Sequence, residues 1–398
     1  MGMKNKFLIK TTCFILLIIS TISCVDPYHL ESTNFEEAIV IEATITNELK
    51  KHEVKLSKTY RFEDNGPTFQ SGASVYVSDD MGNTYDFEED NGKYISVSEF
   101  QAMPQRKYQL NITTSDGKSY ISNEEILTTS IPISDVNAIV TTKEGQRGVQ
   151  LKVNSFDPTA TSKYYRYEYE ETFKIVSPSW VALNLNYNEP PVDDFYYTIR
   201  DNDSKICYST ELSNEIILKS TAEQSEDRVQ DFEVRFISDQ NYIISHRYSI
   251  LVKQYVENLF AYNFYATLQK LSSSESILSQ TQPGFLSGNI KSTSDANEKV
   301  IGFFDVASVS TKRIFFNYSD LFPGENLPPY AIDCTPKTYD ILEPPPPFGL
   351  SPRDFLILEI ENNSSYYFNY QHPLYFMVPP PCADCTTFSS NVIPSFWE

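Results

Sequence analysis

The chain has 398 residues, with 53 Asp and Glu against 32 Lys and Arg and a formal net charge of -21 at pH 7. A surface this acidic repels nucleic acid and anionic lipid headgroups, so we expect neither of them as a ligand. The 27 Tyr and 26 Phe residues, against 2 Trp, suit a strand-rich structure, in which aromatic side chains pack well.

The start of the chain has the order of a secretory signal. Lysines precede an apolar run over residues 14–19, and small or apolar residues then lead into Cys24. A cysteine directly after a cleavage site can take up a diacylglycerol, as in bacterial lipoproteins, and a triacylated N-terminus anchors stably. We expect residues 1–23 to be a signal peptide, Cys24 to be the lipidation site and residues 24–36 to be a tether. An ordinary signal peptide or a single membrane anchor is the alternative.

Residues 37–130 predict a first β-domain. Apolar and polar residues alternate in four segments, which is the pattern of half-buried antiparallel strands: AIVIEATIT, HEVKLSK, ASVYVSDD and YQLNITT. Gly, Asn and Asp between these segments supply the turns. About seven short strands in roughly 90 residues are typical of a β-sandwich, here of the immunoglobulin-like or transthyretin-like kind.

Residues 134–398 predict a larger, sandwich-like β-domain with one inserted helix. The expected strands are GVQLKVNSFD, KYYRYEYEETFKI, DFEVRFIS, YSILVKQY and KVIGFFDVASVSTKRIFF, with DFLILEI and YYFNYQ near the end. Near residues 257–272, ENLFAYNFYATLQKL instead places Phe260, Phe264, Leu268 and Leu271 at helical spacing, so we expect an amphipathic helix there.

Four cysteines besides Cys24 remain in the expected mature chain: Cys207, Cys334, Cys382 and Cys385. An even number of cysteines in an exported protein indicates two disulfides, and three pairings are possible. The spacing of Cys382 and Cys385 also fits a metal-ligand pair, but a zinc site needs a second close pair, which the sequence lacks. We therefore expect structural disulfides, no metal and no cofactor.

No catalytic motif stands out in the sequence. The chain has four histidines without metal-ligand spacing, and it lacks a nucleophile-elbow, zinc-protease or phosphate-loop pattern. Acidic pairs such as Asp79-Asp80 fit a hairpin turn better than the carboxylates of a glycosidase. We therefore expect a protein that is not an enzyme.

Several segments together resemble a known family. In chain order they are CVDPYHLE, AIVIEATITNE, HEVKLSKTYRF, SGASVYVSDDMGNTY, YQLNITTSDGKSY, VKQYVENLFAYNFYATLQKL, QPGFLSGNI and CADCTTFSSNVIPSFW. From Cys24 to Trp397 the chain resembles the Bacteroidetes lipoprotein family called domain of unknown function 4249. The resemblance implies an outer-membrane lipoprotein without an established catalytic residue, encoded beside TonB-dependent receptors.

These observations lead to an expected function and an alternative. We expect a non-catalytic, lipid-anchored outer-membrane lipoprotein that binds a partner or ligand beside a TonB-dependent transporter. The alternative is a stand-alone surface adhesin or glycan-binding lipoprotein. The sequence names neither the small-molecule or glycan ligand nor the face of the outer membrane that the protein occupies.

Overall fold

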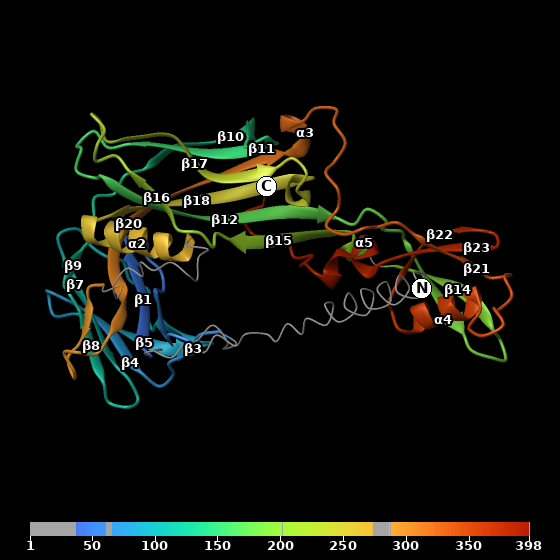
Figure 1. Ribbon diagram of the computed structural model, residues 1–398, viewed down its shortest axis with the longest axis horizontal. Helices are drawn as coiled ribbons and strands as arrows, with labels where there is room; N and C mark the ends of the chain where they lie inside the picture. The colour runs from blue at the N-terminus through green and yellow to red at the C-terminus, as the bar shows by residue number, and fades with distance from the viewer. Residues whose placement is uncertain (1–36, 61–65, 201, 274–285, 287, 398) are drawn as a thin grey trace, which may run out of the picture.

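The computed structural model describes residues 37–60, 66–200, 202–273, 286 and 288–397. The protein is mostly β, as predicted, and it is elongated, with a small lobe at the end opposite the N-terminal strands (Figure 1). Within the described ranges, no helix is long and apolar enough to cross a bilayer. The predicted signal peptide and Cys24 lie outside the described residues.

The N-terminal strands follow the predicted alternation and surround one core. In β1, Ile39, Ile41, Ala43 and Ile45 are buried, and this core continues through the buried positions of the strands that follow. Antiparallel pairing joins most of these strands. They are β1 (Ile39–Thr46), β2 (Glu53–Lys58), β3 (Thr68–Phe69), β4 (Ser74–Asp79), β5 (Thr84–Asp90), β6 (Lys93–Ser96), β7 (Lys107–Thr113), β8 (Ser119–Ser122) and β9 (Glu125–Ile126).

The predicted turn chemistry is present between these strands. Gly82 and Gly117 have backbone φ angles of 85° and 86°, which residues with a Cβ atom rarely adopt. The carboxylate of Asp79 accepts hydrogen bonds from the backbone N–H groups of Met81 and Asn83, and it forms an ion pair with Arg106. The acidic pair at 79–80 is therefore a turn element.

The middle region has two facing sheets around a second core. Residues of β10, β11 and β17 pack against residues of β12 and β18 in one apolar cluster, so this region is sandwich-like. Its strands are β10 (Ile133–Lys143), β11 (Gln146–Phe156), β12 (Tyr164–Val176), β15 (Ile206–Leu212), β16 (Ile217–Ser220), β17 (Arg228–Ser238) and β18 (Arg247–Glu257), with short helical turns η1 (Asn202–Ser204) and η2 (Tyr242–Ile244).

One long strand, β20 (Val300–Asn317), joins the two regions. Its first half pairs in parallel with β1, and its second half pairs antiparallel with β18. The short strand β19 (Ile290–Ser292) pairs with β8. Residues 290–307 therefore complete the N-terminal sheet, although they lie far beyond residue 130 in the sequence. A single sheet runs through both regions in the order β12-β18-β20-β1-β2.

The predicted amphipathic helix is α2 (Leu259–Ser273), which contacts β12, β16 and β20. It lies in the angle between the N-terminal and middle regions (Figure 1). Ala261 is buried on its inner side, whereas Phe260, expected on the apolar stripe, is 77% exposed. The expectation for Phe260 is wrong because its side chain lies on the outer side of the first turn, in which Ala261 takes the buried position.

The small lobe, here called the distal lobe, contains a two-stranded and a three-stranded sheet and one helix. These elements are β13 (Leu183–Asn188), β14 (Asp194–Ile199), β21 (Lys337–Asp340), β22 (Tyr366–Gln371), β23 (Leu374–Val378) and α4 (Pro352–Glu361). Its apolar core is small and includes Leu185, Leu356 and Met377. The short helical segments α3 (Tyr318–Leu321), α5 (Pro380–Ala383) and η3 (Cys385–Thr387) connect it to the middle region.

The predicted strand DFLILEI is wrong, because these residues form most of α4. Ser351 is the N-cap, its hydroxyl accepts from the backbone N–H of Asp354, and the Asp354 carboxylate accepts from the N–H of Ser351 in return. Pro352 occupies the first turn, where its missing N–H has no cost. This capping box starts a helix and outweighs the strand preference of the apolar run.

Candidate functional site

The four predicted cysteines form two disulfides, and the structure gives their pairing. Cys207 on β15 pairs with Cys385, and Cys334 pairs with Cys382, with Cα–Cα separations of 5.8 and 5.6 Å. The first disulfide links the C-terminal segment to β15, an edge strand of the middle region. The second links the segment before β21 to the segment after β23, at the base of the distal lobe. Both have a structural role. Cys24 lies outside the described part of the chain.

A cavity of about 780 Å³ lies between the N-terminal strands, the middle sheet and α2. Its walls come from β1, β2, β12, β18, α2 and β20 and from the loops at 50–52 and 212–216. This volume is within the range of ligand-binding pockets, which is roughly 300–1,000 Å³. We take the cavity as the candidate functional site.

The sheet β12-β18-β20-β1-β2, which runs through both regions, is here called the shared sheet. One of its faces forms most of the cavity wall. The strand registers place Glu42 of β1 beside Phe303 of β20 and Lys55 of β2, and Arg166 of β12 beside Tyr255 of β18. Because side chains alternate along a strand, the opposite face supplies both apolar cores. The polar positions of β1, such as Glu42, therefore face a cavity that α2 covers.

Arg166 is the central charged group of this wall, and it is 7% exposed. Its Nε donates to Glu257 Oε1 at 2.7 Å, and its Nη1 donates to Glu168. The guanidinium carbon lies 4.2 Å from the ring centroid of Tyr255 and 4.6 Å from that of Tyr265 on α2. Two aromatic rings and two carboxylates thus hold the guanidinium in place.

Two buried carboxyl groups lie beside this guanidinium. Glu257 is 3% and Asp305 is 1% exposed, and Asp305 Oδ2 is 3.8 Å from Arg166 Nη2. One oxygen of each carboxyl lacks a hydrogen-bond partner among the described residues. Burial, and then the neighbouring Glu257 carboxylate, raise the pKa of Asp305 well above its usual value. Burial thus favours the protonated form of Asp305, beside the buried ion pair of Arg166 and Glu257.

His52 also lines the cavity, where its Nε2 lies 2.9 Å from the carbonyl oxygen of Phe100. Burial lowers the pKa of His52 to about 4, despite the opposing effect of that hydrogen bond. The imidazole is therefore neutral at pH 7, so its Nε2 carries the proton and donates to this carbonyl. A ring with this pKa is poorly matched to general-base chemistry near neutral pH.

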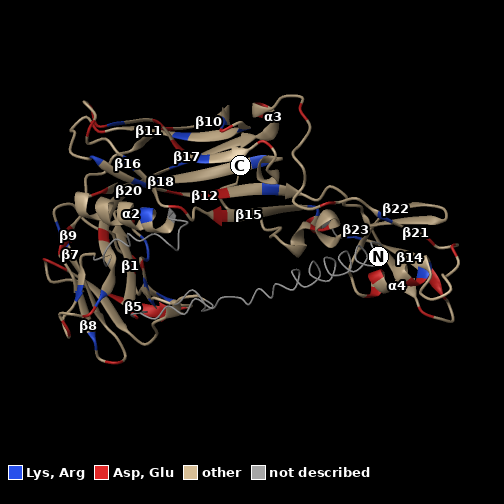
Figure 2. Ribbon diagram, in the orientation of Figure 1, with Lys and Arg blue, Asp and Glu red and all other residues tan. Residues whose placement is uncertain are grey.

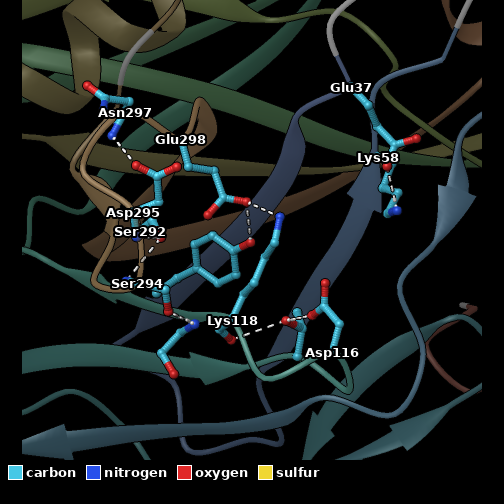
Figure 3. A network of polar contacts seen from close by, with 12 residues as sticks. Glu37, Lys58, Asp116, Lys118, Ser292, Ser294, Asp295, Asn297 and Glu298 are labelled. Atoms are coloured by element: carbon cyan, nitrogen blue, oxygen red, sulfur yellow. Dashed lines mark hydrogen bonds and ion pairs between the residues drawn. The ribbon is translucent and has the colours of Figure 1, made fainter.

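A second, smaller polar cluster lies at the outer edge of the N-terminal sheet (Figure 3). Glu298 accepts from Lys118 Nζ at 2.8 Å and from the Tyr120 hydroxyl at 2.9 Å. The adjoining pocket has a volume of about 50 Å³. These contacts hold the segment between β19 and β20 against β8, so we assign the cluster a structural role. Across the described ranges, no group of three His, Cys, Asp or Glu side chains has the geometry of a metal site.

The charged residues of the cavity wall were not predicted from the sequence. Arg166 and Glu168 alternate with the buried Tyr165, Tyr167 and Tyr169 in β12, within a segment predicted only as a strand. A charged residue inside an otherwise apolar strand could have indicated these positions. Arg and Asp are seldom fully buried without a partner, so such a residue predicts a buried polar cluster. Asp305, in the run GFFDVAS, gives the same signal.

A sequence model of one family, described as "Domain of unknown function (DUF4249)", matches residues 25–313. The chain belongs to this family. The DUF4249 match includes the cavity-lining strands and α2 and ends before β21, so it covers the cavity but only part of the distal lobe. The resemblance expected as far as Trp397 extends beyond this match. No curated protein matches the chain.

Solved structures add little to this identification. A biofilm-associated protein BSP domain aligns with 72% of this DUF4249 chain and 61% of its own length, at 8% identity and a TM-score of 0.14. The alignment thus spans less than two thirds of that structure. A biofilm-associated protein B domain aligns with 69% of this chain and 85% of its own length, at 8% identity and a TM-score of 0.12. Likeness at this level carries no argument.

Proposed function

We propose that this DUF4249 protein is a non-catalytic, lipid-anchored lipoprotein of the outer membrane that binds a ligand beside a TonB-dependent transporter. The observation that carries the binding role is the cavity of about 780 Å³ on the polar face of the shared sheet. The lipid anchor at Cys24 and the transporter neighbour rest on the N-terminal sequence and on the family resemblance. An anchored protein has a high effective concentration towards its membrane neighbours, so a modest affinity for them suffices.

The state of the cavity's ionisable groups favours binding over catalysis. Arg166 is engaged by Glu257 and Glu168, and the Tyr255 hydroxyl donates to Glu168 at 3.0 Å. The His52 ring is neutral and hydrogen-bonded to the backbone. Groups fixed in this way provide a rigid surface, which lowers the entropic cost of binding.

The alternative, a stand-alone adhesin or glycan-binding protein, would be favoured by exposed aromatic rings that lie in one plane. Tyr196 and Tyr197 on the distal lobe are each 41% exposed. The ring of Tyr197 packs against Tyr367 at an interplanar angle of 62°, so these two rings do not form a flat platform. The cavity is therefore the stronger binding feature.

A larger side chain at one position of α2 should fill the cavity, and the same change elsewhere on α2 provides a matched control. Leu268 of α2 lines the cavity, whereas Phe260 of the same helix points away and is 77% exposed. We expect wild-type protein, purified gently from its own membranes, to carry a small molecule in native mass spectrometry. Leu268→Trp should lack this molecule, and the control Phe260→Trp should retain it. An empty wild-type protein, or equal occupancy in both variants, would refute binding in the cavity.

The transporter neighbour needs a separate experiment. We expect crosslinking of intact cells to join the tagged lipoprotein to an outer-membrane TonB-dependent receptor. A Cys24→Ala variant, which cannot be acylated at that position, is the control and should lose the crosslink. If the receptor is not recovered above the background of this control, the accessory role is wrong, whatever the cavity binds.

A further inference from the structure

The strand β14 of the distal lobe is exposed over almost its whole length. Among the described strands it pairs only with β13, and five of its six residues are exposed. They include Tyr196 and Tyr197, each 41% exposed, and Ile199, which is 88% exposed. Edge strands usually carry a lysine, a proline or a bulge that prevents pairing with another chain. The sequence DFYYTI has neither residue, and its pairing with β13 has no register shift.

The backbone of β14 also has hydrogen-bonding groups that face away from β13. Just after the strand, the N–H of Arg200 donates to the carbonyl oxygen of Ala182 at 2.8 Å. Because every second residue of an antiparallel strand bonds to a given neighbour, Phe195, Tyr197 and Ile199 direct their N–H and C=O groups to the open edge. No described residue bonds to the backbone of these three.

Contacts at both ends hold β14 in its extended conformation. At its start, Asp193 forms an ion pair with Arg353 of α4 at 2.7 Å. At its end, the buried Arg200 forms an ion pair with Asp384 at 2.9 Å. Aromatic rings on one face of the strand pack against β22 and β23. A partner that pairs with this edge therefore meets a strand that is already ordered, which lowers the entropic cost of binding.

The edge strand β15 shows how the same chain covers another edge. The N–H of Tyr208 donates to the carbonyl oxygen of Ser390 at 2.7 Å, and the Tyr208 carbonyl accepts from Ser389 Oγ at 2.8 Å. The Cys207–Cys385 disulfide holds this C-terminal segment against β15. In the part of the chain that the structure describes, no segment covers β14 in this way. Its edge is therefore available to a partner.

The charge of the distal lobe indicates the kind of partner. Residues 183–199 and 337–378 contain eight Asp and Glu but only two Lys and Arg. Both cations are in ion pairs within the lobe, Lys337 with Glu359 and Arg353 with Asp193. Figure 2 shows acidic positions on α4 and beside β14. A second copy of this chain would bring the same negative charge, whereas a basic segment would be attracted.

We propose that the open edge of β14 binds an extended, basic segment of a partner protein, which adds a third strand to the β13–β14 sheet. The backbone groups of Phe195, Tyr197 and Ile199 bond to that segment, and its Lys or Arg side chains lie over the acidic lobe. This inference goes beyond the proposed function, and it does not depend on a ligand in the cavity.

The first test compares three peptides on the full-length protein by calorimetry. The basic probe is N-acetyl-Lys-Val-Lys-Val-Lys-Val-amide. One control has Glu in place of each Lys, and the other is the basic peptide with every backbone nitrogen methylated, so that it cannot donate to a strand. The basic probe should bind about tenfold or more tightly than either control, and its affinity should fall as the salt concentration rises.

The second test changes the edge itself. Ile199→Pro removes an N–H that faces the open edge and leaves the bonds to β13 in place, so it should weaken binding of the basic probe about tenfold. The matched control is Ile199→Ala, which keeps this N–H and loses only an exposed side chain, so its affinity should change about twofold or less. Matching thermal melts would show that both variants are folded.

Three results would overturn the inference. The first is that the basic probe does not bind, or binds no better than its two controls. The second is that Ile199→Pro binds this probe as wild type does. The third is that light scattering finds a dimer of the wild-type protein and a monomer of Ile199→Pro, because the occupant of the edge is then a second copy.

Failure of this inference can be told apart from failure of the proposed function. Leu268→Trp, which fills the cavity, should bind the basic probe as tightly as wild type does. A protein that is purified with an empty cavity and still binds the probe through β14 would refute ligand binding in the cavity and support the edge site.

Discussion

The shared sheet and the distal lobe are stabilised in different ways. The strands β12-β18-β20-β1-β2 form one sheet with a large apolar core on each side of the junction, and the cavity lies on the opposite face. The distal lobe has a small core, a helix with a capping box and a disulfide at its base. Extensive apolar burial in the first region can offset the cost of its buried charges, such as Arg166.

This difference indicates where a ligand site can be held firmly. A buried guanidinium keeps its orientation only if rigid elements surround it, and β12, β18 and α2 supply them. The distal lobe instead exposes apolar side chains such as Ile199, at 88%, and Phe348, at 98%. Four changes to the protein test whether the two regions differ in this way.

The largest effect is expected from Arg166→Ala. Removing the guanidinium leaves the Glu257 carboxylate buried without its partner, which should lower the free energy of unfolding by about 3–5 kcal/mol. Arg228→Ala is the control, because Arg228 and Glu226 form an exposed ion pair whose loss should cost about 1 kcal/mol or less. Urea denaturation measures both values. Equal costs would mean that the buried cluster does not stabilise the shared sheet.

Removal of the Cys334–Cys382 disulfide should act on the distal lobe. Replacing both cysteines with serine should lower the free energy of unfolding by about 2–4 kcal/mol, because the unfolded chain gains freedom. Limited proteolysis should then cut first within 337–378, with ligand binding in the cavity unchanged. Early cleavage in β12 or β18 would show that the two regions are not stabilised independently.

A smaller effect is expected from His52, and it depends on pH. Because burial lowers the pKa of His52 to about 4, folding favours the neutral ring, so this stability is present above pH 6.5 and is lost as the pH falls towards 4. Between pH 6.5 and 5, the titration of this ring should lower the free energy of unfolding by about 2 kcal/mol. The His52→Gln variant should lack this part of the pH dependence in a series of urea melts. The same slope in both proteins would contradict burial of the ring.

The smallest effect is expected from Asp305→Asn, which keeps the shape of a neutral carboxyl. The raised pKa means that Asp305 contributes most to stability below its unfolded pKa and that this contribution is lost as the pH rises. The free energies of unfolding of the variant and of wild type should therefore differ by less than about 1 kcal/mol at pH 5. As the pH rises, the variant should become more stable relative to wild type. A variant that loses stability relative to wild type on going to pH 8 would indicate an ionised Asp305.

The sequence predicted the local structure of the strands well. Period-two alternation identified β1, β2, β4 and β7, and glycine marked turns such as that at Gly82. The helix over DFLILEI was missed because an apolar run has no clear period, although Ser351-Pro352-Arg353-Asp354 carries the start signal of a helix. Local pattern was therefore sufficient where side-chain alternation was regular.

The cavity could not be predicted, because it depends on pairing between distant segments. Glu42 alternates with buried residues as a solvent-facing residue would, and only the pairing of β1 with β20 places it on the wall of the cavity that α2 also lines. The raised pKa of Asp305 likewise depends on its burial and on Glu257, which lies on another strand. Sequence periodicity assigns a residue to a face of a strand, and it does not show what covers that face.

Hydrogen exchange compares the shared sheet and the distal lobe in one measurement and shows which of them holds the ligand. The protein carrying the small molecule from its membranes would be compared with the same protein after that molecule has been removed by dialysis. Removal should speed exchange in β1, β12, β18 and α2, which line the cavity, and leave β21, β22 and β23 unchanged. Faster exchange confined to the distal lobe would contradict a ligand site on the shared sheet.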